Sequence, residues 1–213
     1  MSEAKDEVLR RVRAALRDVQ GVREQEYRSL ARDYLQTSEA TVEQRLHLFT
    51  ERLQDYDANV YRCGGSHIGE TIAHALAKRE KHRIVVPDGV PESWLPQHPQ
   101  WLRANNLAFD VLDQCDGVLT GCAVAVAFTG TIILEHSAEN GWRAPTLIPD
   151  YHLCVVRAEQ VVYSLPEAIR RMAAFTSAPI TTISGPSATA DIEMTRIKGV
   201  HGPRFLDIVL VCD

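Results

Sequence analysis

The chain is organised around a polar stretch near its end, Gly185-Pro-Ser-Ala-Thr-Ala-Asp-Ile-Glu-Met-Thr-Arg-Ile-Lys-Gly-Val-His-Gly-Pro203. Apolar runs at residues 180–183 and 205–211 flank it, and such short runs bounded by proline or glycine are typical of buried strands. Gly-Pro imposes a turn at both ends, because proline fixes its own φ and restricts the residue before it. Hydroxyl and carboxyl side chains follow the first turn, and this composition predicts a capped helix start that favours anions. An ordinary capped helix without a ligand is the alternative.

The composition is that of a folded protein with a mildly acidic surface. The 213 residues are 45% hydrophobic, and 23 Lys plus Arg stand against 28 Asp plus Glu, for a net charge of −5. Such a chain can bury a sizeable core, and it lacks the basic cluster that nucleic acids or anionic membranes require. No apolar run reaches the roughly 18 residues of a membrane span, and the first residues do not resemble a secretion signal. We therefore expect a cytoplasmic protein.

The five cysteines are scattered along the chain and never spaced as Cys-x-x-Cys. This spacing excludes a usual zinc ribbon or a self-contained iron–sulfur site. We expect free thiols in a reducing compartment and no cofactor bound by this chain. Three of the cysteines lie in apolar runs and are expected to pack as small buried hydrophobes: Cys122, Cys154 and Cys212.

Residues 1–56 are predicted to form an N-terminal helical arm, followed by an α/β domain at residues 57–213. Residues 3–18 carry apolar side chains at helical spacing, and Gly21 is expected to end this helix. Thr41-Val-Glu-Gln44 offers a capping box for a second helix. The apolar stripe of that helix consists of Val42, Leu46, Phe49 and Leu53. The arm either docks on the domain or reaches a partner.

From residue 57 the pattern predicts a mostly parallel sheet flanked by helices, with an inserted antiparallel β layer. Strands are predicted at residues 59–62, 83–86, 108–112, 117–119, 123–128, 131–134, 153–156, 160–163, 180–183 and 205–211. Helices are predicted at residues 66–79, 97–105 and 166–175. The strands between residues 117 and 134 follow one another too closely for crossover helices, so we expect antiparallel hairpins there. The strands at 153–156 and 160–163 are predicted to form another hairpin.

Three segments together resemble the signature of the LUD-domain family, in particular its lactate-utilization C members. They are Gly185-Pro-Ser-x-Thr-Ala-Asp-Ile-Glu193 with Gly199-Val-His-Gly-Pro203, Thr129-Gly-Thr-Ile-Ile-Leu134, and Arg143-Ala-Pro-Thr-Leu-Ile-Pro-Asp-Tyr-His-Leu-Cys-Val-Val156. The similarity covers the chain from about Asp116 onward. It implies a NagB/RpiA/CoA-transferase-like fold. Many family members carry an acidic residue just before Thr-Gly-Thr, and because Phe128 stands there in this chain, no catalytic role of that carboxylate is carried over.

Two groups of residues are candidates for a functional site. The first is an anion cradle, in which two turns converge at strand ends and an arginine binds the anion bidentately. Its members are Thr129, Gly130, Thr131, Arg143, Gly185, Ser187 and Thr189. The second is an acid/base group of two histidines and two carboxylates, since histidine titrates near neutrality. Its members are Asp191, Glu193, His201 and His152. Ordinary turn residues are the alternative for the first group and structural histidines for the second, and no local ligand spacing predicts a metal site.

Two functions remain open at this level. The resemblance implies a component of an L-lactate utilization system, which oxidises L-lactate to pyruvate with iron–sulfur partner proteins. In that system the chain is a small-anion-binding or assembly subunit, and the clusters belong to its partners. The alternative, by fold analogy, is a stand-alone isomerase or CoA-transferase-like enzyme for a small phosphorylated or carboxylate substrate. Either protein can form a homo-oligomer.

Overall fold

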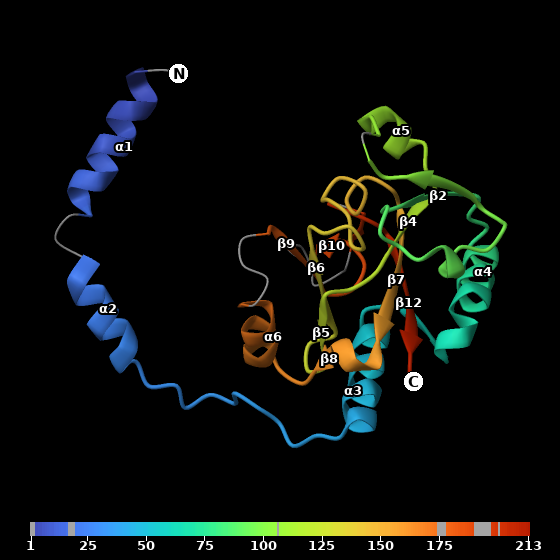
Figure 1. Ribbon diagram of the computed structural model, residues 1–213, viewed down its shortest axis with the longest axis horizontal. Coiled ribbons are helices and arrows are strands. Elements are labelled where there is room, and N and C mark those ends of the chain that lie inside the picture. Colours follow the sequence, from blue (N-terminus) through green and yellow to red (C-terminus); the bar gives the residue numbers. More distant parts are fainter. Residues whose placement is uncertain (1–2, 17–19, 106, 174–177, 190–196, 200) are drawn as a thin grey trace. The chain divides into compact units, whose positions relative to one another are not determined.

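The computed structural model describes residues 3–16, 20–105, 107–173, 178–189, 197–199 and 201–213 (Figure 1). The chain divides into two compact units, residues 1–35 and residues 36–213. The first unit contains α1 (Glu3–Ala15) and α2 (Gln20–Ser29). Gly21 was expected to end the first helix. It lies instead in the first turn of α2. No helix in the described ranges is long and apolar enough to cross a membrane.

The second unit is built on a six-stranded sheet in which every pair of neighbours is parallel. In spatial order its strands are β1 (Asn59–Cys63), β12 (Phe205–Val211), β7 (Tyr151–Arg157), β4 (Gly117–Thr120), β2 (Arg83–Val86) and β3 (Gln100–Arg103). Helix α4 (Ile68–Lys78) packs on one face, where it buries Ile72 and Leu76 against alternate residues of β7 and β12. The parallel sheet and its helical cover confirm the expected fold class.

A second sheet of four strands covers the opposite face of the parallel sheet (Figure 1). Its order is β8 (Val161–Val162), β5 (Val124–Val126), β6 (Thr131–Glu135) and β9 (Ile180–Ile183). β6 is antiparallel to both β5 and β9, as the hairpin prediction requires. Helix α6 (Leu165–Met172) packs on the outer side of this sheet. This sheet is the inserted antiparallel layer, and the pocket described below lies beside it.

Helix α3 (Val42–Asp55) belongs to the second unit. Its capping box is confirmed, because the Thr41 hydroxyl accepts from the Gln44 backbone N–H at 3.3 Å and the Gln44 side-chain amide oxygen accepts from the Thr41 backbone N–H at 2.8 Å. Phe49 and its two stripe neighbours Leu46 and Leu53 are buried between the sheets. Val42, at the helix start, stays 49% exposed. Because the apolar side chains of α3 are part of the hydrophobic core, α3 belongs with the α/β unit, and the boundary between the two units lies upstream of residue 56, at residues 35–36.

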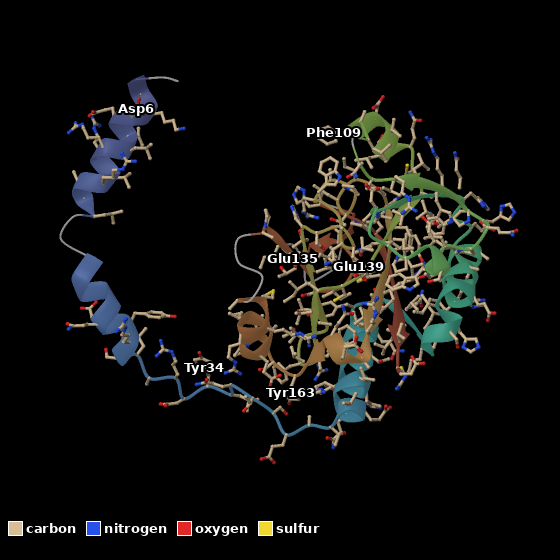
Figure 2. All side chains as sticks on the ribbon, viewed as in Figure 1. Asp6, Tyr34, Phe109, Glu135, Glu139 and Tyr163 are labelled. Carbon is tan, nitrogen blue, oxygen red and sulfur yellow. The ribbon has the colours of Figure 1, made fainter. Side chains whose placement is uncertain are left out.

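In two short segments the predicted type of secondary structure is wrong: a predicted helix contains a strand, and a predicted strand forms a helix. Residues 97–105 were predicted to be a helix, but they contain β3, which pairs in parallel with β2. Pro99 lies within the predicted helix, where proline clashes with the preceding turn. Residues 108–112 were predicted to be a strand, but they form most of α5 (Phe109–Asp113). Helical spacing buries only Leu112, while Phe109 is 65% exposed (Figure 2).

Two further expectations about connections are wrong. β7 and β8 do not form a hairpin, because a short 3₁₀ turn at Ala158–Gln160 redirects the chain and β8 pairs with β5 in the other sheet. The helix expected directly after Gly185 is absent at residues 188–189. There β10 (Ala188–Thr189) pairs antiparallel with β11 (Ile197–Lys198). Residues 190–196 lie outside the described ranges.

The amino end of β12 is held by a buried carboxylate. Asp207 is fully buried and accepts hydrogen bonds from Arg79 at 2.8 Å, Asn59 at 2.9 Å and the Tyr151 hydroxyl at 3.2 Å. A buried charge is tolerated when it is paired and its lone pairs are hydrogen-bonded. The network therefore fixes the start of β12 against β1, α4 and β7.

Candidate functional site

A pocket of about 290 Å³ lies between the two sheets, where β9 ends beside the amino ends of β7 and β12. His152 is the second residue of β7, and Leu206 is the second residue of β12. The pocket walls include five of the residues predicted from sequence: Arg143, His152, Gly185, Ser187 and His201. The turns of the cradle were expected at strand ends of an α/β sheet. Gly185 does follow a strand end, but that strand, β9, belongs to the antiparallel layer.

His152 is buried at the base of the pocket. It is 1% exposed, and its Nε2 lies 2.8 Å from the hydroxyl oxygen of Thr120, the last residue of β4. Burial, helped by the positive charge of Arg143, lowers the pKa of His152 from 6.5 to about 4. The imidazole is therefore neutral near pH 7. At that pH it is a hydrogen-bonding group rather than a cation.

Arg143 supplies the positive charge of the pocket. It lies in the loop between β6 and β7, where its Nη1 donates to the Thr146 hydroxyl at 3.3 Å and the Thr146 hydroxyl donates to the Arg143 carbonyl at 3.0 Å. No carboxylate is found among the lining residues that the structure describes, and none of the described acids pairs with Arg143. Hydroxyl side chains make up much of the rest of the wall: Thr146, Thr181, Thr182, Ser184 and Ser187. This combination favours an anionic ligand.

Ser187 organises the loop that carries His201. Its N–H donates to the Pro203 carbonyl at 2.8 Å, and its own carbonyl accepts from the Gly199 N–H at 2.9 Å. Its hydroxyl accepts from the His201 N–H at 3.0 Å and keeps its own hydrogen for donation. Ser187 thus holds His201 at the exposed rim of the pocket.

The turn Thr129–Thr131 is linked to the pocket but does not line it. The Thr131 hydroxyl lies 2.7 Å from the Thr129 hydroxyl and 2.8 Å from that of Ser184, which faces the pocket. Gly130 has φ of +61°, and a Cβ there would lie 2.8 Å from Arg52 Cβ on α3. Its N–H already donates to the Ala127 carbonyl. The turn is therefore packed on α3, and only the second turn of the expected cradle opens into the pocket.

Two of the remaining predicted residues lie outside the described ranges, and one lies in a short strand. Asp191 and Glu193 fall in residues 190–196, which the structure does not describe. Thr189 lies in β10, opposite Ile197. Phe128, where the acidic residue of the family would stand, is 57% exposed beside Tyr163, with ring centroids 6.0 Å apart.

Metal-binding side chains do not gather in the part of the chain that the structure describes, where no three His, Cys, Asp or Glu residues form a possible metal site. Asp150 instead forms a bidentate ion pair with Arg204 at 2.6 and 2.8 Å, and this pairing lowers the pKa of the Asp150 carboxyl. The five cysteines are all free. Cys122 and Cys154 are buried, as expected of packed thiols, and burial raises the pKa of both. Cys212 was also expected to be buried, and this expectation is wrong, because Cys212 is exposed.

Sequence reasoning missed Thr120 and Ser184. Thr120 is fully buried on β4, and a polar residue within an otherwise apolar strand is the signal that could have found it. Ser184 directly precedes the Gly-Pro turn and connects it to Thr131. Neither residue could be assigned a partner before the order of the strands was known.

Comparison with known proteins identifies relatives over most of the chain. The family model described as LUD domain matches residues 6–211. "Lactate utilization protein C" of Deinococcus radiodurans is 45% identical over 169 residues, which cover 78% of this chain and 79% of that protein. The protein of the same name from Bacillus subtilis is 34% identical over 107 residues, covering 47% and 44%. The crystal structure of a DUF162 family protein from Deinococcus radiodurans has a TM-score of 0.71 at 39% identity, covering 81% of this chain and 99% of the other.

Proposed function

Because the chain belongs to the LUD-domain family, we propose that it is a component of a lactate utilization system and binds a small carboxylate in the pocket of Arg143 and His152. Relatives named lactate utilization protein C support the first part of this proposal. In this role the chain binds substrate or product, or assembles the system, while iron–sulfur partner proteins carry the electrons from L-lactate to an acceptor.

The observation that carries the binding proposal is the charge of the pocket. Arg143 lines it without an acidic partner in the described chain, and the neighbouring side chains offer hydroxyl groups. A guanidinium binds a carboxylate through two parallel hydrogen bonds, and charge-assisted bonds of this kind are stronger than neutral ones. The pocket volume of about 290 Å³ is sufficient for a three-carbon acid with accompanying water.

Calorimetric titration of the purified chain with L-lactate and pyruvate tests the proposal. Arg143→Gln is expected to weaken binding by about 10- to 100-fold, because a hydrogen bond to a charged group contributes about 1.5–3 kcal/mol. Arg62→Gln is the matched control, since Arg62 pairs with Glu43 on the surface, away from the pocket. Equal affinity of the Arg143 variant and the parent would contradict the assigned site.

The role in a multiprotein system has a separate test. Visible iron–sulfur absorption is expected only when partner proteins co-purify with the chain, because its five thiols are free and scattered. Turnover of a sugar phosphate or a CoA ester by the isolated chain would instead favour the stand-alone enzyme.

A further inference from the structure

A buried pair of side chains lies beneath the pocket, contributed by two neighbouring strands. Thr120 ends β4 and is fully buried, and His152, at the start of β7, is 1% exposed. β4 and β7 are adjacent and parallel, with His152 opposite Val118. The strand order therefore holds the Thr120 hydroxyl 2.8 Å from Nε2 of His152.

The direction of this hydrogen bond follows from the need to satisfy a buried hydroxyl. In the described chain, the Thr120 hydroxyl has two possible hydrogen-bond partners: Nε2 of His152 at 2.8 Å and the buried thiol of Cys154 on the neighbouring strand. A thiol sulfur is a weak acceptor, and the Cys154 thiol donates to the Gly121 carbonyl at 3.2 Å. If Nε2 carried the hydrogen, the hydroxyl hydrogen of Thr120 would be left with this weak acceptor alone, which is unfavourable. We therefore assign Thr120 as the donor and Nε2 as the acceptor, which leaves the hydrogen of the neutral ring on Nδ1.

Nδ1 has no hydrogen-bond partner among the described residues, and the His152 side chain lines the pocket. Arg143 lines the same pocket, and its positive charge helps to keep the ring neutral. The pocket thus presents a guanidinium for a carboxylate and an uncharged N–H donor for an additional oxygen atom. The hydroxyls of Ser184 and Ser187 can accept a hydrogen from a ligand hydroxyl.

We propose that His152, oriented by Thr120, donates its Nδ1–H to the oxygen on the carbon next to the ligand carboxylate. The pocket then selects 2-hydroxy and 2-oxo acids over unsubstituted carboxylates. This selection rests on the proposed function, since it takes Arg143 as the partner of the carboxylate. In this arrangement Thr120 is a positioning residue, because it acts on the ligand only through the imidazole.

The test compares the affinities of the full chain for L-lactate, pyruvate and propionate, which has the same length but no oxygen on its second carbon. The parent is expected to bind L-lactate and pyruvate at least tenfold more tightly than propionate. Thr120→Val should reduce this preference to less than threefold and leave propionate affinity unchanged. Thr120→Ser, which keeps the hydroxyl, should retain it.

The outcomes separate the two proposals. If the parent binds all three acids equally, or if Thr120→Val keeps the preference, the selection by His152 is overturned while carboxylate binding stands. If none of the acids binds, the proposed function fails, and the selection fails with it. Nitrogen-15 NMR of the parent imidazole decides the hydrogen position even if Thr120→Val does not fold. A hydrogen on Nδ1 is expected, and a hydrogen on Nε2 would overturn the assignment.

Discussion

The buried imidazole of His152 should make the protein less stable as the pH falls from about 6.5 to 4. Burial and the charge of Arg143 lower its pKa in the folded chain from 6.5 to about 4. Between these values the unfolded chain binds a proton at this side chain and the folded chain does not, so the free energy of unfolding rises with pH. The gap corresponds to about 3 kcal/mol at roughly 1.4 kcal/mol per pH unit. This contribution is fully present above pH 6.5 and is lost by pH 4.

The pH range in which His152 affects stability lies above the range in which the carboxylates do. The lowered pKa of Asp150 gives a linkage of the same sign at lower pH, in which stability is present above the ordinary value of 3.8 and is lost as the pH falls below it. Urea unfolding at half-unit steps from pH 7 to pH 4.5 therefore measures mostly the effect of His152.

The variant for this measurement is His152→Gln. Its amide oxygen can still accept from the Thr120 hydroxyl, but the side chain does not titrate, so the dependence on pH should become shallower by most of the 3 kcal/mol. His82→Gln is the matched control, because His82 is exposed, and its dependence should equal that of the parent. An unchanged dependence in His152→Gln would refute the reasoning, as would a loss of the dependence in His82→Gln.

Three other outcomes concern the fold. Removal of residues 1–35 should leave a folded, soluble chain with a melting temperature close to that of the parent. Removal through Tyr56 should cause aggregation, because α3 is part of the core. If the chain without residues 1–35 does not fold, the division into two units is contradicted. Phe49→Ala should lower the free energy of unfolding by about 3–5 kcal/mol in urea, since the ring is fully buried, and the exposed Val42→Ala should cost less than about 1 kcal/mol. Gly185→Ala should cost more than about 1 kcal/mol in the same assay, because φ is +83° and the added Cβ would lie 2.5 Å from Tyr56 Cβ; a neutral effect would argue against this turn conformation.

The sequence was sufficient for features that depend on a single turn or strand. The capping box at Thr41 and the proline in the first turn of α6 are local, because the groups that satisfy each other lie within four residues. The long apolar run 205–211 is β12 in the structure, as its composition predicts. Local patterns gave the wrong type for β3 and α5, which are only four and five residues long. Pairing with β2 determined the first as a strand, and burial of Leu112 accompanies the helical conformation of the second.

For the candidate site, the sequence predicted several of the residues but not the contacts between them. Arg143, His152, Gly185, Ser187 and His201 were predicted from sequence, and the pocket contains all five. Their relations were not readable, because they depend on which strands become neighbours. The order of β4 and β7 brings Thr120 to His152 across 32 residues of sequence. The pairing of β6 with β9 brings Thr131 to Ser184 across 53 residues. Residue types and local turns are encoded nearby in the chain, but contacts between distant strands depend on the packing of the whole core, and only the tertiary structure determines them.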